Sequence, residues 1–415
     1  MPSVVNKSSF LPLAIPFIGS QRQKKSITER LLRKLTTGLV SGGITFILSD
    51  GQKIEIESGH LGPKPTIELK SMKAIQRLVS GGYVGLAEGY IHGDWSTPSL
   101  PELFDFGAAN IAPLDERLTG NAFVQAANKL VKYMRRNNRS GSRKNISEHY
   151  DLGNDFFAEW LDPSMTYSSG IYTEGAREDL AMAQENKYQR IVDVLGIKNH
   201  HRVLEIGCGW GGFAEFAARE TGAKITGITI SQEQYDFAVA RINNAGLQDQ
   251  VSIVLQDYRD LQGQYDRIVS IEMLEAVGEE YWPTYFKTVS NCLTLNGEAM
   301  IQVITVPDHL FEGYKNSVDF IQRYIFPGGM LPCPAKMATH AADGGLQITD
   351  AFMFGRSYSS TLDAWQIAFQ KHWPEITKFN FNQRFRRIWE YYLDYTSAGF
   401  RAGTIDVGQY HLKKP

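Results

Sequence analysis

A glycine-rich loop is the clearest chemical feature of the sequence. Residues 203–213 read VLEIGCGWGGF, an apolar run followed by four glycines and a helical pattern. Glycines let a backbone turn sharply and approach a ligand closely, and a following helix adds unpaired N–H groups. The loop therefore predicts a site for a nucleotide-like cofactor. NAD sites use similar turns, and a plain turn between a strand and a helix has the same composition.

Acidic residues near the loop favour S-adenosylmethionine over a nicotinamide dinucleotide. Glu205 ends the first strand, where an acid can face a methionine ammonium, whereas a dinucleotide needs the helix N-terminus for its pyrophosphate. In LQDYRD, Asp257 and Tyr258 suit the amine and the face of adenine. No acid ends the intervening strand, so Thr229 and Gln234 are expected to bind the ribose hydroxyls. A nicotinamide-dependent oxidoreductase remains the alternative.

The elements around this loop predict a doubly wound α/β sheet. From about Val203, the apolar runs RVLEIG, KITGITIS, VSIVLQD, DRIVSIEML and EAMIQVITV alternate with helical patterns. Continuous apolar strands that alternate with helices are typical of a mostly parallel sheet. The late segments GLQITDAFMFG and VGQYHLK predict an antiparallel pair at one edge. Residues 306–345 interrupt the alternation and predict an insertion over the top of the sheet.

The chain length predicts two domains. A chain of 415 residues exceeds one compact core. We expect a smaller N-terminal α+β domain at 1–134, a basic linker at 135–147 and the sheet domain at 148–415. Within the first domain, Asp50-Gly51 indicates a hairpin, and residues 70–95 indicate a helix followed by a glycine-rich turn.

The composition argues against several classes of protein. A net charge of -2 predicts no general attraction to nucleic acid. The basic segment 129–145 is either a solvated linker or a contact for phospholipid headgroups. Three cysteines without paired spacing indicate a reducing compartment with neither disulfides nor a metal site. The early apolar run FLPLAIPFIG contains two prolines and is too short to span a membrane. These features predict a cytoplasmic protein that meets the inner face of the membrane peripherally.

The order of the motifs resembles the cyclopropane-fatty-acyl-phospholipid synthase family, in its plant-like branch. The resemblance runs over residues 149–412 and rests on HYDLGNDFF, MTYSSGIY, EIGCGWGGF, GITISQEQ, LQDYRD, EMLEAVG and YIFPGG. It implies a class I methyltransferase fold, Rossmann-like, with S-adenosylmethionine as the methyl donor. The cofactor contacts that it implies are Tyr167, Ser168, Val203, Leu204, Glu205, Gly207, Cys208, Gly209, Trp210, Gly211, Thr229, Gln234, Asp257, Tyr258 and Arg259.

The resemblance also implies a bound bicarbonate that acts as the base. Family positions for a cysteine and a histidine hold Ser169 and Gln302 here, whereas the glutamate, the backbone contact and the tyrosine fall on Glu275, Ile304 and Tyr358. Serine and glutamine can still donate hydrogen bonds to an anion. Each residue also has a structural interpretation: a helix N-terminal acid for Glu275, turn and strand residues for Ser169 and Gln302, and a core tyrosine for Tyr358.

By this resemblance the protein methylates the double bond of an acyl chain within a membrane phospholipid. Loss of a proton from the new methyl group gives a cyclopropane, and loss from the chain gives a methyl-branched alkene. Because two anion-site residues differ in type, the branched product stays open, as does a non-catalytic lipid-binding protein. The apolar stretch SVDFIQRYIFPGGMLP is expected to line the acyl tunnel, and the resemblance implies a homodimer that touches the membrane through its N-terminal unit.

Overall fold

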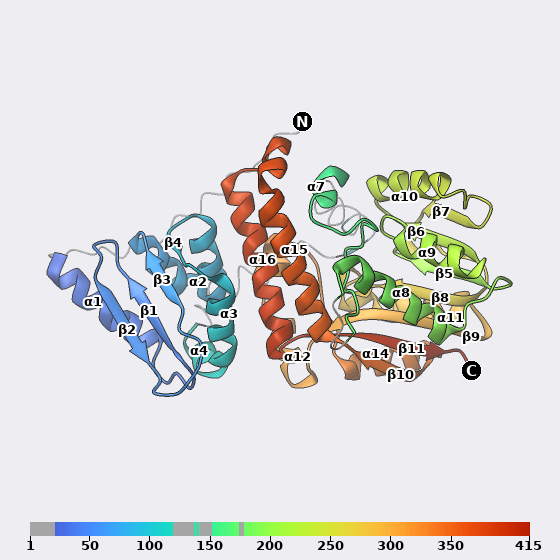
Figure 1. Ribbon diagram of the computed structural model, residues 1–415. Coiled ribbons are helices and arrows are strands. Elements are labelled where there is room, and N and C mark those ends of the chain that lie inside the picture. Colours follow the sequence, from blue (N-terminus) through green and yellow to red (C-terminus); the bar gives the residue numbers. More distant parts are fainter. Residues whose placement is uncertain (1–20, 119–136, 139–140, 142–151, 174–177) are drawn as a thin grey trace.

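The computed structural model describes residues 21–118, 137–138, 141, 152–173 and 178–415. A small sheet and a large sheet lie at opposite ends of the molecule, with two long helices between them (Figure 1). The basic segment 129–145 and the predicted linker lie mostly outside the described residues. None of the helices in the described ranges is both long and apolar enough to cross a bilayer.

The N-terminal unit is built on a four-stranded sheet in the order β2-β1-β3-β4. The predicted hairpin at Asp50-Gly51 is present, because β1 and β2 pair antiparallel around it. The strands are β1 (Gly43–Ile47), β2 (Lys53–Glu57), β3 (Thr66–Leu69) and β4 (Trp95–Ser96), and the helices are α1 (Gln21–Leu35), α2 (Met72–Ile91), α3 (Leu100–Ala109) and α4 (Ile111–Leu118).

The glycine-rich turn predicted within residues 70–95 is wrong, since α2 continues through it to Ile91. Gly82 alone departs from helical geometry, with a φ of 56°, and it produces a kink. Gly89 serves packing, because a Cβ there would lie 2.7 Å from the Trp95 side chain. Tertiary packing therefore outweighs the low helix propensity of these glycines.

The large sheet has seven strands in the order β10-β11-β9-β8-β5-β6-β7. Its central strands pair in parallel, as predicted, and β11 pairs antiparallel with both β9 and β10. The strands are β5 (Arg202–Ile206), β6 (Lys224–Thr229), β7 (Val251–Leu255), β8 (Tyr265–Ile271), β9 (Leu293–Thr305), β10 (Gln347–Met353) and β11 (Asp406–Lys413).

Helices cover the large sheet because its strands are apolar on both faces. In β5, all residues but the first are buried. The connecting helices are α8 (Leu180–Leu195), α9 (Gly212–Thr221), α10 (Gln232–Asn244) and α11 (Trp282–Cys292). This is the doubly wound class I methyltransferase fold, and it places the carboxyl ends of the parallel strands along one edge, where ligands bind in such sheets.

Three shorter helices and a long helical pair complete the fold. The insertion after β9 forms α12 (Asp308–Asn316), α13 (Phe320–Tyr324) and α14 (Pro334–Asp343). The helical pair consists of α15 (Gly355–Ile376) and α16 (Gln383–Ala402), which pack against each other. Helix α16 also contacts α2 and α3. There the Arg387 guanidinium donates to the Tyr90 carbonyl at 2.7 Å, and the Tyr90 hydroxyl donates to Glu390 at 3.2 Å.

Candidate functional site

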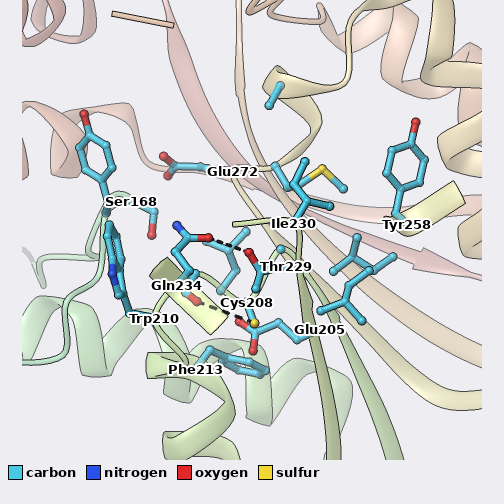
Figure 2. Close-up of a pocket in the computed structure, with 18 of the residues that line it drawn as sticks. Ser168, Glu205, Cys208, Trp210, Phe213, Thr229, Ile230, Gln234, Tyr258 and Glu272 are labelled. Carbon is cyan, nitrogen blue, oxygen red and sulfur yellow. Dashed lines mark hydrogen bonds between the residues drawn. The ribbon is translucent and has the colours of Figure 1, made fainter. Parts of the chain in front are cut away.

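A pocket of about 1090 Å³, its open mouth included, lies at the carboxyl ends of β5, β6 and β8. Figure 2 shows side chains from several elements pointing into it. Most of the predicted cofactor contacts line it, and Val203, Leu204 and Gly211 do not. The predicted contacts in its wall are Tyr167, Ser168, Glu205, Gly207, Cys208, Gly209, Trp210, Thr229, Gln234, Asp257, Tyr258 and Arg259.

The glycine loop forms one side of the pocket, which we call the glycine-loop side (residues 205–213). Gly207, Gly209 and Gly211 have φ values of 84°, 52° and 83°, which side chains rarely adopt. A Cβ on Gly207 would also lie 2.8 Å from Met273. Helix α9 begins at Gly212 without a side-chain cap. The loop thus exposes backbone rather than side chains to a ligand.

Glu205 is a buried acid with an unused oxygen. Its side chain is almost fully enclosed, and its Oε2 has no hydrogen-bond partner among the described residues. Burial raises the pKa of this carboxyl well above its usual value, and nearby Lys187 opposes the shift. A buried acid without a partner is costly. A bound cationic group such as an ammonium would relieve that cost, so the residue fits the methionine end of S-adenosylmethionine.

Polar side chains at the ends of β6 and β7 are partly committed to one another. The Thr229 hydroxyl donates to Gln234 Oε1 at 2.8 Å, as Figure 2 shows. Ser231 caps α10 by accepting from the Gln234 N–H. Asp257 accepts from the Arg259 guanidinium at 2.7 Å, so an adenine amine would share this carboxylate with Arg259. These pairs fix the side chains that were predicted to hold ribose and adenine.

A buried lysine that the sequence did not single out lies behind Ser168 of the pocket wall. Lys187 Nζ donates to the Ser168 hydroxyl at 2.7 Å. Burial lowers the pKa of Lys187 to about 7, while Glu272, Asp162 and Glu205 act in the opposite direction. Lys187 lies in α8, within the polar run ENKYQR, where nothing distinguishes it from a solvated helix residue.

Three of the predicted anion-site residues converge on a protein carboxylate, that of Glu272. The Ser169 N–H and the Gln302 amide donate to Glu272 Oε1 at 2.9 and 2.8 Å. The Tyr358 hydroxyl donates to Glu272 Oε2 at 2.6 Å. The Ser169 hydroxyl donates to the Gly170 carbonyl at 2.8 Å, so Ser169 meets Glu272 through its backbone alone.

The other two predicted residues meet at a second carboxyl beside the first. The Ile304 N–H donates to Glu275 Oε1 at 2.6 Å, and Glu275 Oε2 has no hydrogen-bond partner in the described residues. Burial and the charge of Glu272 raise the pKa of Glu275 to about 8. We call these two acids, with Ser169, Gln302, Ile304 and Tyr358, the carboxylate cluster.

Glu272 lines the pocket and has an unusual backbone conformation. It follows β8 directly, and its φ is 50°, a region that costs a glutamate free energy. Strain of this kind is kept where the surroundings hold it in place, and here three donors hold the carboxylate. An acid at the end of an apolar strand was a usable signal, yet within EMLEAVG only Glu275 was assigned a role.

Tyr358 lies in the first turn of α15 and stacks on Phe400 at 4.4 Å between ring centroids. Further aromatic rings pack around Tyr167, which lies in the pocket wall. Trp365 lies 5.3 Å from Tyr167, and Phe326 lies 6.1 Å from Tyr167, again between ring centroids. Phe326 belongs to the stretch that was expected to line an acyl tunnel. The cluster therefore opens toward an aromatic, apolar environment.

The insertion is tied to the cluster through the backbone. The Met330 N–H donates to the Glu275 carbonyl at 2.8 Å, and Asn137 Nδ2 donates to the Gly328 carbonyl at 2.8 Å. Arg259 in turn donates to the Asn137 carbonyl at 3.3 Å. One chain of contacts thus connects the adenine side, the insertion and the acids. In the described residues no group of histidine, cysteine or acidic side chains could hold a metal ion.

Comparison with known proteins places this arrangement in a family. The model of the family described as mycolic acid cyclopropane synthetase matches residues 137–410. Cyclopropane-fatty-acyl-phospholipid synthase of Escherichia coli is 37% identical over 349 residues, which cover 83% of this chain and 86% of the relative. Tuberculostearic acid methyltransferase UfaA1 of Mycobacterium tuberculosis is 36% identical over 400 residues, covering 93% and 91%.

Solved structures agree with the sequence relatives. Mycolic acid cyclopropane synthase CmaA1, complexed with SAH and CTAB, is 28% identical with a TM-score of 0.62 and covers 66% of this chain and 98% of its own. These relatives are methyltransferases, so the nicotinamide-dependent oxidoreductase considered from the glycine loop is wrong. The chain belongs to the mycolic acid cyclopropane synthetase family and is an S-adenosylmethionine-dependent methyltransferase.

Proposed function

We propose that this enzyme methylates the double bond of unsaturated acyl chains in membrane phospholipids and closes a cyclopropane ring. One observation carries the proposal: Glu272 of the carboxylate cluster and the Tyr167 ring line the same pocket as the glycine loop. An alkene is a weak nucleophile, so the protein has to align it with the donor and exclude water.

Bound S-adenosylmethionine supplies an electrophilic methyl group on a sulfonium. The glycine loop would let it approach the backbone closely, and Glu205 and Ser168 would hold its methionine end. Thr229 and Gln234 would bind the ribose, and Tyr258 would pack on the adenine. The position of these side chains in the pocket wall supports this assignment.

The apolar wall suits the substrate and the charge that forms on it. The Tyr167 ring lies in the pocket wall, with Trp365 and Phe326 packed near it, and aromatic faces stabilise a nearby cation. The buried carboxylates add negative charge in a region of low polarity, where electrostatic stabilisation is strong. Both features lower the free energy of a carbocation on the acyl chain.

Mass spectrometry of lipids tests the proposal. The chain is expressed in a host that lacks cyclopropane lipids, and labelled methionine is supplied. We expect phospholipid acyl chains to gain one labelled methylene unit as a cyclopropane. A methyl-branched product would support methyl transfer but contradict ring closure. The branched product is a real alternative because the relative UfaA1 is a tuberculostearic acid methyltransferase. Unlabelled lipids would reject the substrate class.

A variant of the carboxylate cluster tests the site separately. Glu275→Gln removes a buried acid next to Glu272. We expect turnover to fall while affinity for S-adenosylhomocysteine stays within about twofold, since Glu275 does not line the cofactor pocket. Unchanged turnover would contradict the assignment of the cluster to catalysis. Peripheral membrane binding and a homodimer remain predictions from the resemblance.

A further inference from the structure

The anion site expected from the resemblance is already filled by the protein. The three donors that a bicarbonate would need, the Ser169 N–H, the Gln302 amide and the Tyr358 hydroxyl, are all within 2.9 Å of Glu272. The Ile304 N–H is likewise used by Glu275. A further anion would lack these donors and would be repelled by the neighbouring acids. The described residues therefore do not fit a bound bicarbonate.

Glu272 offers the same chemistry as the ion that it excludes. Its carboxylate has two trigonal oxygens and a negative charge, and it lies in the wall of the pocket. Figure 2 shows it on the same side of the pocket as Ser168. We propose that the Glu272 carboxylate, rather than a bicarbonate ion, accepts the proton released after methyl transfer. This inference rests on the proposed function, because it assigns the base of that reaction.

The proposed step balances without any further reactant. The alkene π pair forms a bond to the methyl carbon, the old S–C bond leaves its pair on sulfur, and the neighbouring chain carbon becomes cationic. One C–H bond of the new methyl group then breaks, its electron pair closes the ring, and the proton moves to a Glu272 oxygen. Glu272 releases this proton to solvent between turnovers.

The two acids of the cluster lie in unequal electrostatic environments. Burial raises the pKa of Glu272, but three donors aimed at its carboxylate oppose that shift by favouring the ionised form. Glu275 has one donor, and its pKa of about 8 keeps it protonated at neutral pH. Lys187, from α8, also favours the charge on Glu272. Environments that separate two acids in this way assign one as the base.

A row of buried side chains fixes the direction of the Gln302 donor. Arg190 Nη1 donates to Gln409 Oε1 at 2.6 Å, and Gln409 Nε2 donates to Gln302 Oε1 at 3.1 Å. Arginine can only donate, so it orients both amides and leaves the Gln302 N–H pointing at Glu272. Gln302 and Gln409 are fully buried. Gln409 and Arg190 are therefore positioning residues for the proposed base.

The backbone at Glu272 provides a clean variant. A φ of 50° is comfortable for glycine, so Glu272→Gly removes the carboxylate and relieves backbone strain. It leaves a vacancy of carboxylate size that the Ser169, Gln302 and Tyr358 donors still face. Glu272→Gln is the matched control, because it fills the same space with an amide that cannot accept the proton.

The experiment measures bicarbonate dependence. Wild-type enzyme, S-adenosylmethionine and vesicles of dioleoyl phosphatidylethanolamine and phosphatidylglycerol are assayed in buffer stripped of carbon dioxide, with and without added bicarbonate. We expect the wild-type rate to change less than about twofold and both variants to lose about 100-fold or more, the usual size of a general-base contribution. Bicarbonate should restore Glu272→Gly at least about tenfold and leave Glu272→Gln unrescued.

A binding measurement separates this inference from the lipid substrate. Nuclear magnetic resonance of carbon-13 bicarbonate should detect binding to Glu272→Gly and none to wild type. Bicarbonate bound by wild type, or a wild-type rate that collapses without it, would overturn the inference. So would a Glu272→Gly enzyme that needs no bicarbonate. If no lipid is methylated, the proposed function fails while the binding result still decides the anion site. Affinity for S-adenosylhomocysteine shows that the variants are folded.

Discussion

The glycine-loop side of the pocket and the carboxylate cluster depend on different parts of the chain: the first on backbone conformation, the second on a hydrogen-bond network. The loop comes from one continuous stretch, presents backbone and depends on positive φ values at Gly207, Gly209 and Gly211. The cluster combines side chains and two backbone N–H groups from segments up to 189 positions apart, counting from Ser169 to Tyr358 (358 − 169), and depends on hydrogen bonds between them. Backbone sites tolerate most changes except at glycine, whereas a side-chain network is sensitive at each of its members.

The largest effect is expected at the glycine loop. Gly207→Val places a β-branched residue at a φ of 84° and puts its Cβ within 2.8 Å of Met273. We expect affinity for S-adenosylhomocysteine to fall about 100-fold or more, measured by calorimetry, because the loop must move away from the ligand. Gly313→Ala is the control, since a Cβ at Gly313 meets nothing within 4 Å. If Gly207→Val binds S-adenosylhomocysteine with wild-type affinity, the glycine-loop side does not depend on backbone conformation as we infer.

The next effect concerns the cluster and separates turnover from binding. Tyr358→Phe removes the hydroxyl that donates to Glu272 at 2.6 Å and keeps the ring that stacks on Phe400. A hydrogen bond to a charged group contributes about 1.5–3 kcal/mol, so kcat should fall about 10- to 100-fold. Affinity for S-adenosylhomocysteine should stay the same. Tyr391→Phe, in the aromatic contact between α16 and the N-terminal unit, should leave both values unchanged.

A smaller effect is expected one step further from the base. Gln409→Leu removes the N–H that holds the Gln302 amide, so Gln302 can turn its carbonyl toward Glu272. We expect kcat to fall about fivefold. The acidic limb of the pH–rate profile should move to higher pH, because a carboxylate with fewer donors has a higher pKa. Gln347→Leu at the exposed edge strand β10 should change neither. If the pH–rate profile of Gln409→Leu is the same as that of wild type, Gln409 only contributes to packing.

The smallest effect is on stability and its dependence on pH. The pKa of Glu275 in the folded protein, about 8, lies above its ordinary value of 4.5. The contribution of this group is therefore fully present below 4.5 and is lost as the pH rises through 8. Glu275→Gln should lose less thermal stability than wild type between pH 6 and pH 9, by a few degrees in Tm. Equal dependence of Tm on pH in the two proteins would contradict a raised pKa at Glu275.

The sequence predicted the residues of the cofactor side more directly than those of the carboxylate cluster. Glu205, Thr229 and Asp257 were placed from their positions at strand ends, because parallel strands bring those ends together. Ser169, Gln302 and Tyr358 were found through the resemblance, and in the structure all three donate to one carboxylate. That shared partner was not expected, since the carboxylate of Glu272 takes the place assigned to a small anion.

Lys187, Gln409 and Arg190 could not have been singled out from their neighbours. Each lies in an ordinary helix or strand pattern, and its role depends on which other element packs above it. The same holds for α15 and α16, since no sequence motif marked their aromatic residues as functional. The two helices hold Tyr358 in place and connect the two units.

The sequence by itself determined the alternation of strands and helices, the glycine loop and the chemical family of the chain. Local patterns carry this information, because apolar periodicity and glycine content act over a few residues. Only the tertiary structure decided that Glu272 fills the anion site, that Ser169 donates through its backbone and that Arg190 orients the amides. Such hydrogen bonds join residues distant in sequence, so they exist only once the chain has folded.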